Sequence, residues 1–346
     1  MKKIPIVFSF DNNYVVPAAV AFYSLLNKAA LSVFYHMFVL HNDITDKNQK
    51  LLQDIVQKMH NAELHFVHTG NFLQKEWQTG NYEGHQFKAQ FTAQTLLRCF
   101  AARLLPHWDK VIYSDVDVVV MDDISELIDV DLSHSGGVYL AGVKNVFSLY
   151  SPSELSHLNA EHYAMLKNSY IAGGIWVMNL KKIRQDHLEE KMLDIIQNNN
   201  ICKRWIEQDV MNIACENKTV FLPLNYIAYP YLHHLLKFPE FKSLYSRDEL
   251  YDSIISPKII HYAAVKPWQT EDCDYAPIWW QIFDYLKLPR TAIFKNHSLA
   301  KEREENFQQH LKKQELHFKK RKKQFLLILF LQSVFIFVLT FKLFFY

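Results

Sequence analysis

Two aspartates, separated by one valine, follow an apolar run. In the stretch VIYSDVDVVV, residues 111–120, Asp115 and Asp117 stand where burial would be expected to continue. In an extended chain, residues two apart point to the same side, about 6.6 Å apart along the backbone, so both carboxylates would face one space. Such oxygen ligands suit Mg²⁺ or Mn²⁺, which could neutralise a diphosphate leaving group. A solvated strand end would give the same pattern, so the pair leaves both interpretations open.

A second stretch, HYAAVKPW at residues 261–268, adds two more chemically capable side chains. The imidazole of His261 could complete a metal site, and Lys266 could pair with phosphate oxygens. A histidine near a strand end is often structural, so this stretch is also ambiguous by itself. Three further stretches are notable: FSFDNNYV at 8–15, LLRCF around Arg98, and EQDVMN at 207–212.

Apolar runs alternate with amphipathic stretches in the first half of the chain, which is typical of βα units and a mostly parallel sheet. This pattern predicts strands at 4–10, 32–41 and 62–68, and helices around 17–28, at 45–60 with Thr45 as N-cap, and at 92–105. The last helix would lead into the strand that carries Asp115. Ligands of open α/β sheets bind at the carboxyl ends of strands, which favours a functional aspartate pair.

The second half is less regular. Residues 173–184, GGIWVMNLKKIR, predict a strand running into a helix, and EQDVMNIAC at 207–215 predicts the start of another helix. Residues 223–256 are rich in aromatic side chains, and we expect an irregular loop region there.

Composition excludes some classes of protein. A hydrophobic content of 49% supports a large core, and a formal charge of +2 is too small and too mixed for a nucleic-acid binder. The chain has four cysteines without a CxxC pair, and we expect them to be unpaired, as in a reducing compartment: Cys99, Cys202, Cys215 and Cys273.

The C-terminal end has a different character. Residues 298–324 are charged and predict a helical stalk, and residues 325–346 are apolar with few interruptions. As a helix, the apolar segment would be roughly 33 Å long, against about 30 Å of hydrocarbon, so it could span a bilayer or lie in its interface. Seven Lys or Arg residues within 312–324 favour a cytoplasmic position for the rest of the chain.

Taken together, the DxD pair, the HxxxxKPW stretch and the first-strand motif resemble glycosyltransferase family 8, over about residues 4–290. The resemblance implies a GT-A type fold with a mostly parallel central sheet in a domain at 1–290. It also implies a metal-dependent enzyme that retains anomeric configuration and uses UDP-sugars. Bacterial lipopolysaccharide glucosyl- and galactosyltransferases belong to this family.

The resemblance also implies roles for individual residues. Ser9, Asp11, Asn13 and Tyr14 would hold the uracil and ribose of the donor, and Arg98, Ala264 and Lys266 would contact the donor as well, with Lys266 on its diphosphate. Asp115, Asp117 and His261 would ligate Mn²⁺ or Mg²⁺. Gln208 would lie close to the anomeric carbon, and Asp209 would hold sugar hydroxyls.

The chain departs from the family pattern at two places. Relatives usually have glycine at the position of Ala264, and an acidic residue often stands where this chain has Lys144 and Asn145. These departures bear mainly on the choice of sugar.

The expected function is transfer of glucose or galactose from a UDP-sugar to a glycan acceptor, such as lipopolysaccharide core or another lipid-linked oligosaccharide. We expect acceptor contacts in the aromatic segment 223–256, and a location at the cytoplasmic face of the bacterial inner membrane. Two alternatives remain. VIYSDVDVV also resembles the first motif of haloacid-dehalogenase-type phosphohydrolases, and the chain could be a nucleotide-sugar-binding protein with weak or no turnover.

Overall fold

The computed structural model describes most of the chain up to residue 289. The described residues are 1–73, 94–146, 155–198, 206–216, 218–237, 245–263, 265–270 and 273–289. Residues 1–267 and 272–292 form one compact unit, which contains the helices and strands of the described residues. Residues 268–271 and 293–346 form a second unit. The predicted stalk at 298–324 and the predicted membrane segment at 325–346 lie outside the described residues.

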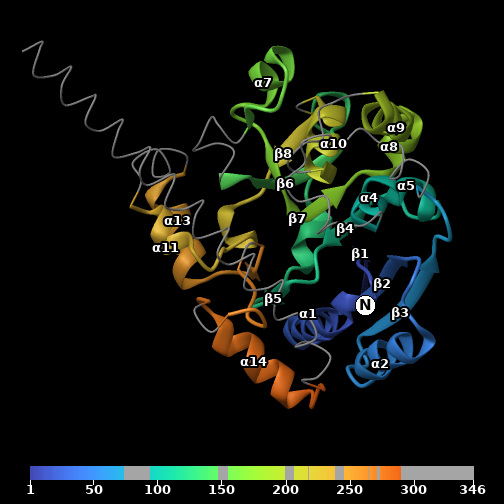
Figure 1. Cartoon of the computed structure of the whole chain (residues 1–346), viewed down its shortest axis with the longest axis vertical. Helices are drawn as coiled ribbons and strands as arrows, with labels where there is room; N and C mark the ends of the chain where they lie inside the picture. Colours follow the sequence, from blue (N-terminus) through green and yellow to red (C-terminus); the bar gives the residue numbers. More distant parts are fainter. Residues whose placement is uncertain are drawn as a thin grey trace, which may run out of the picture. The chain divides into compact units, whose positions relative to one another are not determined.

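The N-terminal half builds one side of a seven-stranded sheet of order β3-β2-β1-β4-β7-β6-β8. Its first three strands run parallel: β1 Lys2–Ser9, β2 Val33–His41 and β3 Ala62–His68. They are connected by α1 Val15–Lys28 and α2 Asp46–Gln57, which lie side by side (Figure 1). The strands and helices predicted up to residue 68 are confirmed, and Thr45 occupies the N-cap position of α2, although its side chain makes no capping hydrogen bond.

The other side of the sheet departs from a purely parallel order. β4 Val111–Ser114 is parallel to β1, but β7 Ile171–Met178 is antiparallel to both of its neighbours, β4 and β6 Leu140–Lys144. The last strand, β8 Thr219–Phe221, is parallel to β6. Every residue of β7 is buried, which explains its continuous apolar sequence. The predicted mixed α/β fold with a mostly parallel central sheet is confirmed.

The aspartate pair lies between two sheets. β4 ends at Ser114, the chain bends at residues 116–117, and β5 Val118–Val120 then pairs antiparallel with β9 Ile259–His261 in a separate two-stranded sheet. The expectation of an extended chain through both aspartates was therefore wrong. The bend carries the backbone from one sheet to the other, and it places His261 opposite Val118.

The helix predicted at 92–105 is broken. In the described part it consists of α4 Gln94–Leu97, the 3₁₀ turn η3 Arg98–Phe100 and α5 Ala101–Leu104. The 3₁₀ turn coincides with Arg98, whose buried guanidinium is bonded to residues of the sheet. Tertiary contacts therefore outweigh the helical periodicity at this point.

The described residues of the segment 223–256, which are 223–237 and 245–256, are more regular than the irregular loop region that we expected. They contain η7 Leu224–Tyr226, α11 Leu232–Leu235 and α13 Arg247–Ile255. α13 begins with a capping box, in which Ser246 accepts from the backbone N–H of Glu249 and the Glu249 side chain accepts from the backbone N–H of Ser246. The S-x-x-E spacing of Ser246 and Glu249 indicates the start of a helix, but the prediction of a loop rested on the aromatic composition of the segment.

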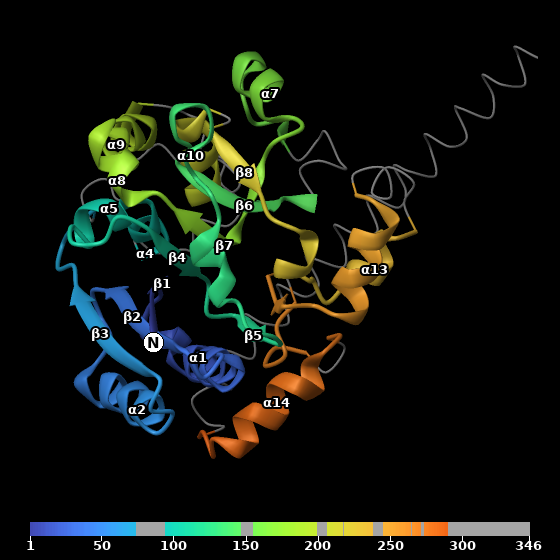
Figure 2. The same ribbon diagram turned by 180° about the vertical axis from the view of Figure 1, so that it is seen from behind.

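The described residues contain further helices and 3₁₀ turns. They are η1 Asn12–Tyr14, η4 Ser125–Asp129, η5 His134–Gly136, α7 Ala160–Leu166, α8 Leu180–Gln185, α9 Leu188–Asn198, α10 Ile206–Cys215 and α14 Ala276–Tyr285. Seen from behind, α8 and α9 lie together (Figure 2), and they pack with α10 around a core that includes Phe100, Tyr113 and Trp176.

Cys99, Cys215 and Cys273 are buried, and for Cys99 and Cys215 the prediction of an unpaired thiol is confirmed. Cys202 lies outside the described residues. Within the described part of the chain, none of the helices combines the length and the apolar character that crossing a bilayer requires.

Candidate metal and donor site

Asp115, Asp117 and His261 converge where the bend after β4 meets the end of β9. The Nε2 atom of His261 lies 3.5 Å from Oδ2 of Asp115 and 3.3 Å from Oδ1 of Asp117. One ligand atom from each residue falls within 4.8 Å of the others. The β5–β9 pairing fixes this approach, because the backbone N–H of Tyr262 donates to the carbonyl oxygen of Asp117.

Each carboxylate also has a buried cation as neighbour. An Nη atom of Arg98 lies 2.7 Å from Oδ1 of Asp115, and the ammonium of Lys266 is bonded to Oδ2 of Asp117. Burial by itself would raise the pKa of both carboxyls, but Arg98 together with His261 outweighs burial at Asp115, and Lys266 together with His261 does so at Asp117, so both pKa values are lowered. Both aspartates are therefore ionised near neutral pH.

His261 responds to the same charges in the opposite direction. Burial favours the neutral ring, but Asp117 and Asp115 outweigh it and raise the pKa of His261 to about 9. Its Nδ1 atom is buried and has no hydrogen-bond partner among the described residues. Two carboxylates and an imidazole already converge here, and these ligands suit a divalent cation. Such a cation would replace the proton that the imidazole carries between the two carboxylates. The residues present therefore fit a metal site.

Two consecutive glycines of β7 form one wall of this site. The carbonyl of Gly174 accepts from the backbone N–H of Asp115 at 3.0 Å, and the carbonyl of Gly173 accepts from Arg98 at 3.3 Å. A Cβ atom on Gly174 would come within 2.4 Å of Nδ1 of His261. From the sequence, these glycines were expected only as the start of a strand, and no local signal indicated that the imidazole needs this space.

Arg98 is buried rather than a solvated charge at a helix end. Its guanidinium lies over the ring of Tyr113, 4.6 Å from the ring centroid. The hydroxyl of Tyr113 donates to the same oxygen of Asp115, at 2.6 Å. Arg98 and Tyr113 therefore hold Asp115 in one orientation, and sequence reasoning missed Tyr113.

The start of α10 carries three consecutive polar residues near the site. Glu207, which sequence reasoning also missed, is buried 3.8 Å from Arg98, and burial raises its pKa. The side-chain oxygen of Gln208 accepts from Asn145 at 3.1 Å. Asn145 is one of the positions at which the chain departs from its relatives, so this departure contacts a predicted catalytic residue.

Asp209 has two firm partners inside the protein. Its side chain is fully buried, the hydroxyl of Tyr170 donates to Oδ1 at 2.7 Å, and Nε2 of His157 lies 2.9 Å from Oδ2. Holding a sugar hydroxyl would require at least one of these contacts to be shared or exchanged. The arrangement is that of an anchor between α10 and the sheet.

The predicted uridine-binding residues lie at the carboxyl end of β1. Ser9 is buried and donates to the carbonyl of Gln94 at 2.6 Å, and Asp11 caps η1 by accepting from the backbone N–H of Asn13 at 2.9 Å. Burial opposes the charge on Lys266, but Asp117, Tyr14 and Asp115 together outweigh burial and raise the pKa of Lys266. Ala264 lies outside the described residues.

Comparison with known proteins identifies the family of the chain. The family model described as glycosyl transferase family 8 matches residues 5–272, which is most of the chain. The chain belongs to glycosyltransferase family 8. A curated relative in this comparison is the lipopolysaccharide 1,2-glucosyltransferase of Escherichia coli K12, which is 29% identical over 201 residues, covering 57% of this chain and 52% of that protein. The glycosyltransferase GlyF of Streptococcus pneumoniae is 24% identical over 284 residues, covering 80% of this chain and 60% of that protein.

Solved structures show the same fold. The bifunctional glycosyltransferase WbbM matches with a TM-score of 0.66 and 24% identity, covering 86% of this chain and 52% of that one. The galactosyltransferase LgtC, solved in complex with donor and acceptor sugar analogues, matches with a TM-score of 0.64 and 20% identity, covering 83% of this chain and 97% of that one. This family 8 chain thus spans little more than half the length of several proteins that it matches.

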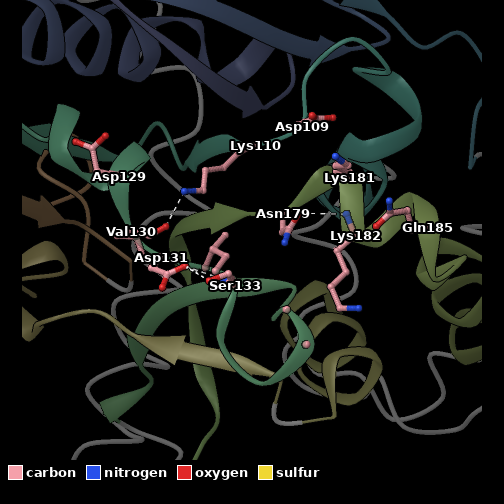
Figure 3. A pocket seen from close by; sticks show the side chains of 13 residues that line it. Asp109, Lys110, Asp129, Val130, Asp131, Ser133, Asn179, Lys181, Lys182 and Gln185 are labelled. Carbon is pink, nitrogen blue, oxygen red and sulfur yellow. Dashed lines mark hydrogen bonds between the residues drawn. The ribbon is translucent and has the colours of Figure 1, made fainter.

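A polar pocket of about 720 Å³ lies at the opposite end of β4, where the chain enters that strand (Figure 3). None of the predicted site residues of this family 8 chain lines the pocket. The ammonium of Lys110 in its wall donates to the carbonyls of Ile128 and Val130, at 2.8 and 2.6 Å. This lysine thereby holds the end of η4 against the start of β4. The pocket itself is separate from the predicted donor site.

Proposed function

We propose that the chain is a metal-dependent retaining hexosyltransferase that moves glucose or galactose from a UDP-sugar to a hydroxyl of a glycan acceptor. The observation that carries the proposal is the convergence of Asp115, Asp117 and His261 between two buried cations, Arg98 and Lys266. Family membership supports it, because donor binding at a metal is what the resemblance implied from the sequence.

Asp115, Asp117 and His261 would hold Mn²⁺ or Mg²⁺. When bound, the ion would supply positive charge to the diphosphate of the donor as its bond to the sugar breaks. Lys266 would exchange part of its contact with Asp117 for a phosphate oxygen, because an ammonium can serve two anions at once. Arg98 would act through Asp115, which it holds in place together with Tyr113.

Retention by a front-face substitution fits the surroundings of α10. In such a reaction, an oxygen of the departing diphosphate accepts the proton of the acceptor hydroxyl as that hydroxyl attacks the sugar on the same face. A double displacement would instead need a carboxylate nucleophile. The carboxylate of Asp209 at the start of α10 is fully buried and bonded to Tyr170 and His157, which disfavours it as such a nucleophile.

The acceptor is proposed to be lipopolysaccharide core or another lipid-linked oligosaccharide. A lipopolysaccharide glucosyltransferase among the relatives supports this choice. The basic segment 312–324 and the apolar segment 325–346 support attachment to the cytoplasmic face of the bacterial inner membrane, close to such an acceptor. Neither the family match nor the structural relatives support a haloacid-dehalogenase-type phosphohydrolase.

The proposal is tested by UDP release from purified protein with four donors: UDP-glucose, UDP-galactose and their N-acetylated forms. We expect slow release from one donor with Mn²⁺, little release with a chelator, and loss of the metal-dependent release in Asp115→Asn. Release that is equally fast with chelator, or unchanged in Asp115→Asn, would contradict the proposed metal site.

A further inference from the structure

Two histidines and a glutamate meet on one face of the β2–β3 pair, apart from the candidate donor site. Nδ1 of His36 lies 2.5 Å from Oε1 of Glu63, and Nε2 of His65 lies 2.9 Å from the same oxygen. The three ligand atoms fall within 4.8 Å of one another. We propose that His36, Glu63 and His65 form a second metal site, which binds a divalent transition metal such as Zn²⁺.

The parallel register places these side chains together. His36 is paired with Glu63 across the two strands, and His65 follows Glu63 by two residues, so both β3 side chains project from the same face. Ligands on neighbouring strands of a regular sheet are held more rigidly than ligands on loops. The cluster therefore needs no rearrangement of the backbone to assemble.

Aromatic rings fix the orientation of both imidazoles. The ring of His65 is stacked on Phe38 with centroids 5.3 Å apart, and the ring of His36 lies against Phe34 and Trp108, at 5.4 and 5.3 Å. Because packing restricts both imidazoles, little side-chain entropy would be lost when a metal binds.

The polar contacts converge on one point. Nδ1 of His36 and Nε2 of His65 approach a single carboxylate oxygen of Glu63. In a tetrahedral zinc site with bonds of about 2.0–2.1 Å, ligand atoms lie roughly 3.3 Å apart. A small outward movement of the ligand atoms would reach that spacing.

The ligand atoms of this cluster favour a different metal from the one proposed for the UDP-sugar site. Two imidazoles and one carboxylate suit Zn²⁺ and its neighbours Cu²⁺, Ni²⁺ and Co²⁺, whereas Mg²⁺ prefers oxygen ligands. The side chains of Glu63 and His65 are 45% and 48% exposed, so an ion can enter and a water can complete its coordination. An ion at this place would join β3, the first strand in the order of the sheet, to β2.

Zinc binding to the full-length chain without an affinity tag tests the proposal. Isothermal titration with ZnCl₂ would compare the wild type with Glu63→Gln and His65→Gln, and with His68→Gln as the matched control. His68 is exposed on the same strand but alternates to the other face. We expect Glu63→Gln and His65→Gln each to remove one equivalent of zinc, or to weaken its binding at least about tenfold, while His68→Gln binds as the wild type does.

The same comparison in an Asp115→Asn background separates this site from the donor site. We expect His65→Gln to remove one equivalent of zinc in that background as well, and Co²⁺ to give the intense visible absorption of a four-coordinate site only when His65 is present. Zinc should raise the melting temperature of the wild type by about 5 °C at a hundredfold excess over its dissociation constant. Equal zinc binding by wild type and His65→Gln, or no zinc binding by either, would overturn the proposal and leave the metal dependence of UDP release untouched.

Discussion

At the scale of single residues, Gly174 determines how closely β7 can lie to the imidazole of His261. A Cβ atom there would approach Nδ1 and Cε1 of the ring at 2.4 and 2.5 Å, whereas a Cβ on Gly173 would meet the flexible side chain of Gln208 at 3.0 Å. The two glycines are adjacent, yet a methyl group on each would disturb a different predicted function.

We predict that Gly174→Ala weakens metal-dependent UDP binding by at least about tenfold, because the ring of His261 must move and overpacking of this kind costs about 1–3 kcal/mol. Gly173→Ala is the matched control. It should keep metal-dependent UDP binding and lower turnover by displacing Gln208. Calorimetry of UDP binding and the UDP-release assay measure the two effects, and equal UDP affinity in Gly174→Ala and wild type would contradict the prediction.

Asp209 offers a second test at this scale, because its partners indicate an anchor. Asp209→Ala would leave the buried hydroxyl of Tyr170 and a ring nitrogen of His157 without their carboxylate. We predict a loss of about 3 kcal/mol in the free energy of unfolding, measured by urea denaturation. Tyr170→Phe, which removes one of the two contacts, should cost about 1–2 kcal/mol. If Asp209→Ala were as stable as the wild type, the anchor interpretation would be wrong.

The sequence identified the site residues that belong to short motifs. Asp115, Asp117 and His261 were expected as ligands, and the structure brings them together. Their ligand role, and the donor-binding roles, stay predictions. Gly174 and Glu207 were not expected to matter, because their contacts with His261 and Arg98 join residues far apart in the chain. Tyr113 is only two residues from Asp115, but its role depends on Arg98, which packs on its ring from an earlier helix.

At the scale of secondary structure, helix α13 shows which signal decided an ambiguous segment. Its capping box joins Ser246 and Glu249 through two hydrogen bonds. Thr45 also occupies an N-cap position, at the start of α2, but its side chain makes no capping hydrogen bond. The two positions form a natural pair for comparison.

We predict that Ser246→Ala lowers the free energy of unfolding by about 1 kcal/mol, since a capping hydrogen bond is lost and an N–H of the first turn is left unpaired. Thr45→Ala should cost clearly less, because no such bond is broken. Urea denaturation provides both values, and hydrogen exchange of α13 amides reports the local effect. A larger loss in Thr45→Ala than in Ser246→Ala would show that the capping box contributes little.

Periodicity predicted the elements of the first seventy residues well, because each strand and helix there is long and regular. It failed at 92–105, where burial of Arg98 interrupts the helix, and at the bend after β4, where pairing with β9 redirects the chain. Both failures result from contacts that are distant in sequence, which a local pattern does not contain.

At the scale of the whole molecule, the proposal separates catalysis from attachment. The family match lies within residues 5–272, and the basic and apolar segments follow it. We predict that deletion of residues 298–346 moves the protein from the membrane pellet to the supernatant after cell fractionation, while the affinity for UDP changes less than about threefold. Truncated protein that stays in the pellet and resists extraction at high salt would contradict attachment through this segment.

The central claim is that Asp115, Asp117 and His261 form the metal site through which the donor binds. Calorimetric titration of UDP into wild-type and Asp115→Asn proteins, each with Mn²⁺ and with chelator, tests it most directly. We predict that Mn²⁺ strengthens UDP binding to the wild type by at least about tenfold and has little effect on Asp115→Asn. Equal binding of UDP by the wild type with and without metal, or an undiminished effect of Mn²⁺ on Asp115→Asn, would contradict the claim.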